Sequence, residues 1–190
     1  MTVAARTKYV RAILLALTVV SLGQGAVDKK PGVIVFPGKS SNYPSPDGRY
    51  MLVNVDDASM NPPHKLLLRD NKTGGETTLL SYNRWVGVLW SPSGSALLVN
   101  DHKESDEADV YVFTLDPSTH RVSMLDQLRH DFPGDPSLFQ NDHVYIEATA
   151  WITEKKIEVK AYGHGDVDPK GFTNFFEYTL GDHVQRVRSN

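Results

Sequence analysis

Short apolar runs separated by polar turn residues recur along most of the chain. The runs are rich in β-branched, aromatic and Leu residues, and Gly, Pro, Asn, Asp or Ser bound nearly every one, a pattern typical of β-strands. Only residues 126–130 suggest a helix, and we expect it to be too short to matter. The predicted strands lie at about 33–36, 49–55, 64–69, 76–81, 85–90, 96–100, 109–115, 121–125, 143–151, 156–162, 174–180 and 183–188. The pattern therefore predicts an all-β meander.

One segment of this pattern occurs twice, 46 residues apart. The turn Ser45-Pro46-Asp47-Gly48-Arg49 precedes an apolar run, and Ser91-Pro92-Ser93-Gly94-Ser95 precedes a second. A degenerate third copy follows. In it Trp151 precedes a turn-like stretch, just as Trp90 precedes the second turn. The repeats span about 33–81, 85–127 and 138–188. A period of about 40–50 residues built from short strands is typical of β-propeller blades.

Two motifs in these repeats resemble the WD40-like repeats of TolB-type propellers. Those repeats read Trp-Ser-Pro-Asp-Gly, a strand, and later an Asp-x-x-Thr-Gly turn. Here Trp90-Ser91-Pro92-Ser93-Gly94 matches the first motif except at Ser93, and Asp70-Asn71-Lys72-Thr73-Gly74 matches the second fully. The resemblance covers about 33–188 and implies a propeller-like architecture, but it says little about activity because such blades serve many functions.

The number of repeats is too small for a closed propeller. Three blades fit into the chain, whereas closed propellers typically have four to eight. An open stack, a ring completed by a second chain and a sandwich-like collapse remain as alternatives. We expect a propeller-like stack of about three four-stranded antiparallel blades in an incomplete or open ring, with a homodimer as the way to cover the open edge.

The N-terminal residues have the features of a secretory signal peptide. Arg6, Lys8 and Arg11 form a basic leader, and the apolar stretch Ala12–Leu22 is followed by small residues. This stretch is too short to span a bilayer, although an uncleaved anchor is the alternative. We expect a signal peptide at 1–26, a linker at 27–32 and one domain at 33–190. The mature protein would be periplasmic or secreted, without stable membrane insertion.

Composition excludes several classes of function. Without the leader the chain has 17 basic and 23 acidic side chains, so nucleic acid is not an expected partner. The absence of Cys excludes a lipoprotein anchor, disulfides, thiol catalysis and Cys-ligated zinc. Gly38-Lys39-Ser40 lacks the spacing of a phosphate-binding loop, and no Gly-x-Ser-x-Gly motif is present. We assign no catalytic residue.

Acidic and histidine residues recur after the second strand of each repeat, and equivalent propeller loops emerge on one face. The candidate binding residues are Asp57, His64, Asp101, His102, Asp106, Asp109, His164, Asp166 and Asp168. Such a face suits a basic partner. No cofactor is expected, although carboxylates with imidazoles also suit a divalent cation such as calcium. The third interpretation is that these residues belong to ordinary solvated loops.

These observations favour an exported, non-enzymatic binding module that recognises a protein or peptide, which would be basic, through its acidic loop face. A metal-dependent hydrolytic enzyme with its site on the same face is one alternative. A structural subunit of an envelope complex is the other. The sequence provides no nucleophile or cofactor motif that would favour an enzyme.

Overall fold

The computed structural model describes residues 32–115 and 118–189. The predicted signal peptide and nearly all of the predicted linker lie outside the described residues. Within them, no helix is long and apolar enough to cross a membrane.

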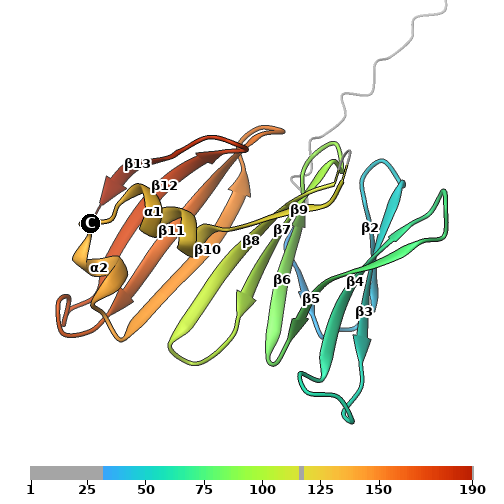
Figure 1. Cartoon of the computed structure of the whole chain (residues 1–190), viewed down its shortest axis with the longest axis horizontal. Coiled ribbons are helices and arrows are strands. Elements are labelled where there is room, and N and C mark those ends of the chain that lie inside the picture. Colours follow the sequence, from blue (N-terminus) through green and yellow to red (C-terminus); the bar gives the residue numbers. More distant parts are fainter. Residues whose placement is uncertain (1–31, 116–117, 190) are drawn as a thin grey trace, which may run out of the picture.

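The described residues form three four-stranded antiparallel units, which we call blades 1 to 3 (Figure 1). Blade 1 consists of β2 (Asn42–Pro44), β3 (Tyr50–Asp56), β4 (His64–Asp70) and β5 (Glu76–Tyr82), and blade 2 of β6 (Trp85–Trp90), β7 (Ala96–His102), β8 (Glu107–Thr114) and β9 (His120–Ser123). Blade 3 consists of β10 (His143–Trp151), β11 (Lys156–His164), β12 (Phe172–Thr179) and β13 (Val184–Ser189). In addition β1 (Ile34–Phe36) pairs with β6. The predicted strands are present within a few residues of their expected ends, whereas the sequence missed β2.

The blades do not close into a ring, and two of them share a sheet. Strand β9 pairs with only the second half of β8, from Tyr111 to Thr114. The first part of β8 is therefore free to pair in parallel with β10, where Val144 lies opposite Glu107. Blades 2 and 3 and β1 thus form one nine-stranded sheet, while blade 1 is a separate four-stranded sheet. The expected open, propeller-like all-β architecture is confirmed, but the blades are less independent than a simple stack implies.

Blade 2 is buried on both faces because it lies between the other two blades. Its strand β7 is buried at every residue from Ala96 to Asp101. One core cluster fills the space between blades 1 and 2, around Trp90, and a second lies between blades 2 and 3. Strand β12 of blade 3 instead alternates between buried and half-buried residues, as a strand with one solvated face does.

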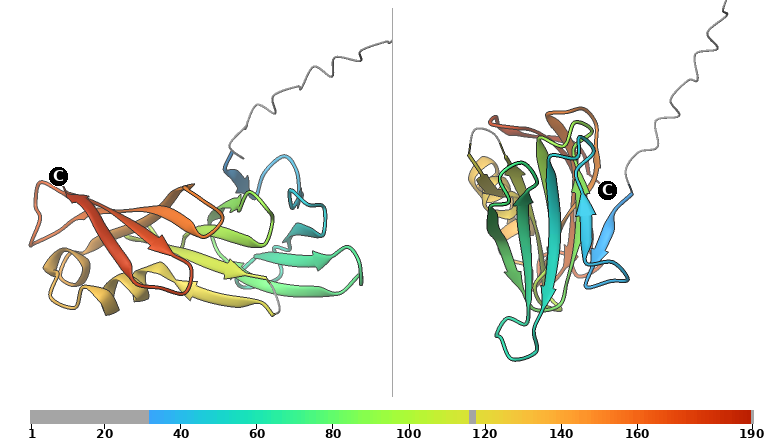
Figure 2. Two further views of the ribbon diagram at one scale, coloured as in Figure 1. Left: turned by 90° about the horizontal axis from the view of Figure 1, so that it is seen from above. Right: turned by 90° about the vertical axis from the view of Figure 1, so that its right-hand side faces the viewer.

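Two short helices, α1 (Met124–Asp131) and α2 (Pro136–Phe139), connect blade 2 to blade 3 and cover one face of blade 3 (Figure 2). Ser123 is the N-cap of helix α1, and its side chain accepts a hydrogen bond from the Asp126 backbone N–H. It buries Met124, Leu125 and Leu128 in the same core cluster as blade 3. The expectation that this segment is too short to matter is therefore wrong, because its apolar face completes the core.

The repeated turns have the same local structure in blades 1 and 2. The hydroxyl of Ser45 accepts a hydrogen bond from Tyr50 N at 2.9 Å, and that of Ser91 accepts one from Ala96 N at 3.1 Å. Gly48 and Gly94 have φ values of 72° and 80°, a conformation that glycine adopts without steric cost. These turns lie at the top of Figure 1 and leave the opposite ends of the strands for other loops.

Candidate functional site

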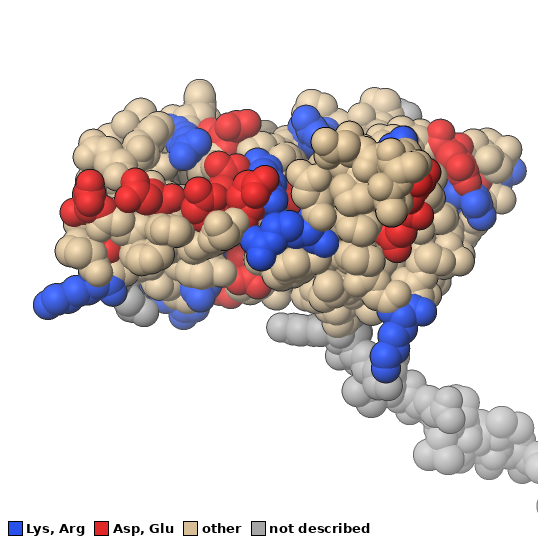
Figure 3. Space-filling view, turned by 90° about the horizontal axis from the view of Figure 1, so that it is seen from below, with Lys and Arg blue, Asp and Glu red and all other residues tan. Residues whose placement is uncertain are grey.

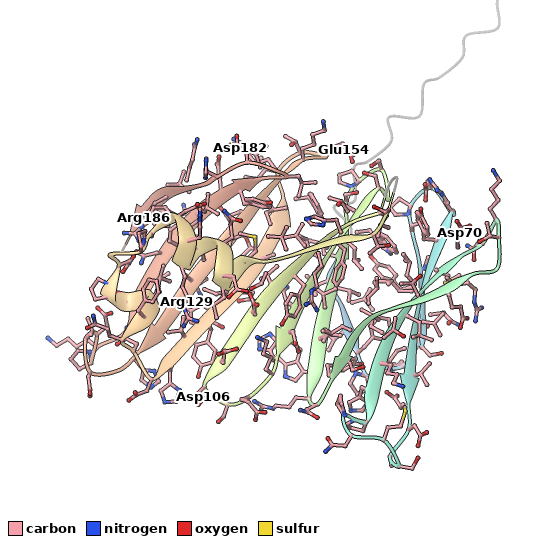
Figure 4. All side chains as sticks on the ribbon, viewed as in Figure 1. Asp70, Asp106, Arg129, Glu154, Asp182 and Arg186 are labelled. Atoms are coloured by element: carbon pink, nitrogen blue, oxygen red, sulfur yellow. The ribbon has the colours of Figure 1, made fainter. Side chains whose placement is uncertain are left out.

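Three hairpin loops and one turn lie along a single edge of the molecule, at the bottom of Figure 1. They are the β3–β4 loop (57–63), the β5–β6 turn (83–84), the β7–β8 loop (103–106) and the β11–β12 loop (165–171). We call this the loop edge. Figure 3 shows this edge from below, with Asp and Glu side chains in a row across its left half. In Figure 4, Asp106 lies at the loop edge, whereas Glu154 and Asp182 lie at the opposite edge.

A pocket of about 400 Å³ opens between blades 1 and 2 at the loop edge. Blade 1 contributes the end of β5, including Tyr82, to its wall. Blade 2 contributes Asp101, Lys103, Glu104, Asp106, Glu107 and Tyr111. Four carboxyl groups and one ammonium group therefore face a single cavity between two aromatic residues.

Asp101 is the most unusual of these groups. Its residue is only 4% exposed, and its Oδ1 atom is one of two buried side-chain polar atoms without a hydrogen-bond partner among the described residues. Burial raises the pKa of Asp101 to about 6; the carboxylates of Asp109 and Glu107 act in the same direction, and Lys103 opposes them. At neutral pH this strand end therefore holds a buried carboxylate without a full set of partners.

Lys103 is bound by other acidic groups of the pocket wall. Its ammonium nitrogen lies 2.8 Å from Glu107 Oε1 and 3.8 Å from Asp109 Oδ2. It also lies 5.6 Å from the centre of the Tyr111 ring. Burial alone would lower the pKa of Lys103, but the hydrogen bond from its ammonium group to Glu107 and the charge of Asp109 raise it overall. Lys103 is therefore an ammonium ion that Glu107 and Asp109 hold in place.

Asp109 does not lie in the β7–β8 loop, as the sequence suggested, but within β8, where it is 1% exposed. Its carboxylate accepts hydrogen bonds from Ser123 Oγ at 2.7 Å and from Leu125 N at 2.9 Å. Asp109 thus binds the start of α1 to the sheet. The expectation of a loop residue is wrong because β8 already begins at Glu107 and both of its faces are buried around Asp109, where donors satisfy the carboxyl group.

His102 lies at the end of β7, next to Asp101, and its ring stacks on that of Trp85, with the centroids 3.4 Å apart. Successive side chains of a strand point to opposite faces, so His102 and Asp101 lie on different faces of blade 2. Burial, followed by the charge of Arg84, lowers the pKa of His102. His102 is therefore not a neighbour of Asp101 within the pocket.

In blade 1 the predicted residues make local contacts. Asp57 accepts hydrogen bonds from the backbone N–H and the hydroxyl of Ser59 and so shapes the β3–β4 loop. His64 lies 2.7 Å from Asp56 Oδ1 and stacks on the ring of Tyr82. These contacts build the blade 1 side of the loop edge.

In blade 3 the predicted residues lie at the far end of the loop edge. The rings of His164 and His143 are 4.2 Å apart, and Asp168 accepts a hydrogen bond from Asn141 Nδ2 at 2.8 Å. Asp166 is exposed in the same loop. No group of three or more His, Asp or Glu side chains within residues 32–115 and 118–189 is arranged to hold a metal ion.

Only two of the predicted binding residues, Asp101 and Asp106, share the pocket. The structure adds Glu104, Glu107 and Lys103 to the pocket. No sequence signal pointed to Tyr82, because it reaches the pocket from another blade. The candidate site is therefore narrower than the predicted face and lies at the junction of two blades.

Comparison with known proteins supports the fold and says nothing about this site. No family model matches the sequence, and no curated protein does. Among solved structures, the chain is similar to the β-propeller domain of the Trilobed protease from Pyrococcus furiosus, which is described as having an open velcro topology. The TM-score is 0.51 at 13% sequence identity, over 78% of this chain and 43% of that one. The chain therefore has a β-propeller-like fold and spans less than half of the structure that it matches.

Proposed function

We propose that this protein is an exported, non-enzymatic binding module that recognises a basic segment of a protein or peptide through its loop edge. The observation that carries this proposal is the pocket between blades 1 and 2, whose wall holds four carboxyl groups, those of Asp101, Glu104, Asp106 and Glu107, against one ammonium group, that of Lys103. A cleft with an excess of one sign of charge attracts partners of the opposite sign and speeds their association. The basic leader and the apolar stretch after it support export.

A binding test needs a probe of defined charge. A blocked, fluorescently labelled peptide of Arg, Lys, Gly and Ser is titrated with the domain at about 50 and about 300 mM salt. A second peptide carries Glu in place of Arg and Lys. We expect anisotropy to rise with the basic peptide only, and the affinity to fall at the higher salt concentration because exposed charges are screened.

Charge-matched variants locate the interaction. The double variant Glu104→Gln, Asp106→Asn removes two exposed carboxylates from the loop edge. Its control, Glu154→Gln, Asp182→Asn, removes two exposed carboxylates from the opposite edge (Figure 4). We expect the first variant to bind the basic peptide about tenfold more weakly and with less dependence on salt, and the control to bind as the unmodified protein does. Equal affinities of the two variants would refute recognition at the loop edge.

A further inference from the structure

The pocket has the chemistry to receive one particular side chain. We propose that it binds the guanidinium group of an arginine from the partner, with Asp101 as the buried counter-ion. This inference rests on the proposed function and specifies the chemical group that the site takes.

The buried Oδ1 atom of Asp101 has no hydrogen-bond partner among the described residues. A buried polar atom without a hydrogen bond is unfavourable, and such atoms are rare in folded proteins. The neighbouring residue on β7, Asn100, is equally buried, but its Oδ1 accepts a hydrogen bond from Ala148 N at 2.8 Å and its Nδ2 donates one to Ala148 O at 3.2 Å. The fold can therefore satisfy polar groups at this end of β7. Since Asp101 also lines an open pocket, its missing donor can come from a bound molecule.

The cation of the pocket wall, Lys103, is already paired with a carboxylate of that wall. Lys103 pairs with Glu107 and lies near Asp109, as described above. Asp109 in turn is satisfied by Ser123 and Leu125. Among the described residues, Asp101, Glu104 and Asp106 are the carboxyl groups of the pocket that form no salt bridge, so the pocket keeps an excess of negative charge.

The shape of an arginine side chain suits the pocket better than that of lysine. A guanidinium group is planar and carries five N–H donors, so it can bond to two carboxylates at once and stack on an aromatic ring. Here one carboxylate of the pocket wall, Asp101, is buried at the end of β7 and another, Asp106, is exposed in the β7–β8 loop. The half-buried Tyr111 is the aromatic ring of the wall that already lies beside cations, those of Lys103 and Arg121. A lysine ammonium is a compact charge that uses fewer of these partners.

The charge state of Asp101 agrees with this role. Glu107 and Asp109 of β8 oppose its ionisation, Lys103 favours it, and Tyr82 of β5 faces it across the pocket. Burial raises the pKa of Asp101 to about 6, so the carboxylate is mostly ionised at neutral pH. A guanidinium group beside it would favour the charged form further.

The direct test uses blocked tripeptides, acetyl-Gly-Xaa-Gly-amide, with Xaa as arginine, lysine or citrulline. Citrulline has nearly the shape of arginine but no charge. Each is titrated into the uniformly ¹⁵N-labelled domain at pH 7.5 while amide shifts are followed by NMR. We expect saturable shifts at 80–83 and 101–107 with arginine, about tenfold weaker binding with lysine and none with citrulline. Equal shifts with arginine and citrulline would overturn the inference without the use of any variant.

Asp101→Asn tests the counter-ion, with Asp182→Asn as the charge-matched control at the opposite edge. We expect Asp101→Asn to abolish the preference for arginine over citrulline, and Asp182→Asn to retain it. If the unmodified protein binds the longer basic peptide but gives no saturable shifts with the arginine tripeptide, the inference is wrong and the proposed function stands. If it binds neither, both are wrong.

Discussion

The two junctions that blade 2 makes with its neighbours differ in whether their buried polar groups have hydrogen-bond partners. At the junction with blade 3, Trp151 Nε1 donates to Leu89 O at 3.2 Å, and Asn100 pairs with the backbone of Ala148. At the junction with blade 1, the equivalent Trp90 Nε1 and Asp101 Oδ1 both lack partners. They are the only two such buried side-chain atoms within the described parts of the chain.

This difference indicates different roles for the two junctions. The junction with blade 3 is continuous with the sheet through β8 and β10 and is reinforced by α1, so its polar groups bind parts of the fold to one another. The junction with blade 1 joins two separate sheets and opens into the acidic pocket. A fold retains unsatisfied polar groups at a cost in stability, and sites that bind ligands are where such costs concentrate.

The largest expected effect is the loss of the polar bond at the junction with blade 3. Asn100→Ala leaves both the N–H and the C=O of Ala148 without their partner, in a buried environment. We expect the free energy of unfolding to fall by about 2–4 kcal/mol, measured by urea denaturation at pH 7. The exposed Asn83→Ala serves as a control and should change it by less than about 0.5 kcal/mol. If Asn100→Ala and Asn83→Ala changed the free energy of unfolding equally, the bonds of Asn100 would not stabilise the junction with blade 3, and the two junctions would not differ.

The second prediction concerns Asp101, whose replacement we expect to raise the free energy of unfolding rather than lower it. Its pKa in the folded protein is about 6 against an ordinary value of 3.8, so the folded state binds the proton more tightly than the unfolded state. The resulting stability is fully present below about pH 4 and is lost as the pH rises through about 6. Asp101→Asn removes this loss.

We therefore expect Asp101→Asn to raise the free energy of unfolding by about 1–3 kcal/mol at pH 8 and to leave it nearly unchanged near pH 4. Urea denaturation at several pH values measures the difference. A destabilised variant at pH 8 would mean that Asp101 supports the fold, as Asp109 does, and would break the comparison between the junctions.

The third prediction compares the two equivalent tryptophans. Replacement by Phe removes similar volume at both positions, but only at Trp151 does it also leave a carbonyl group, that of Leu89, without its donor. We expect Trp151→Phe to cost about 1 kcal/mol more than Trp90→Phe in the free energy of unfolding. Thermal and urea denaturation of the pair, measured in parallel, give this difference. No difference would show that the Trp151 bond contributes little.

The smallest effect is expected on the solvated face of blade 3. Lys156 Nζ and Glu177 Oε2 are 2.9 Å apart, and both side chains are about one third exposed. Exposed ion pairs contribute little, so Glu177→Gln should change the free energy of unfolding by less than about 0.5 kcal/mol, and less still at high salt. A larger change would mean that the outer face of blade 3 also supports the fold through its charges.

Local sequence patterns predicted the blades because the relevant physics is local. Pro at the second turn position, a Ser hydroxyl bound to the backbone and a positive φ at Gly48 or Gly94 define the same turn wherever they occur. Alternation separates Phe175 from the fully buried Phe176, as expected of adjacent strand residues. By contrast β2 was missed, since it has only three residues and one of them is Pro44, which is typical of turns.

For the candidate site, the sequence placed an acidic cluster in the right loop but could not rank its members. Asp101 and Asp109 lie opposite each other in the register of β7 and β8, and both are buried. One is satisfied by residues at the start of α1, and the other faces a pocket whose far wall comes from β5. Nothing near either residue in the sequence distinguishes them.

The sequence by itself determined every strand but β2, the repeated turns and the edge of the molecule that carries the acidic loops, because these follow from backbone preferences and the alternation of side chains. Only the tertiary structure decided which carboxylates are bound within the fold and which one is left without a partner. Burial and hydrogen-bond satisfaction depend on which distant strands meet, and for Asp101 the decisive neighbours lie in another blade.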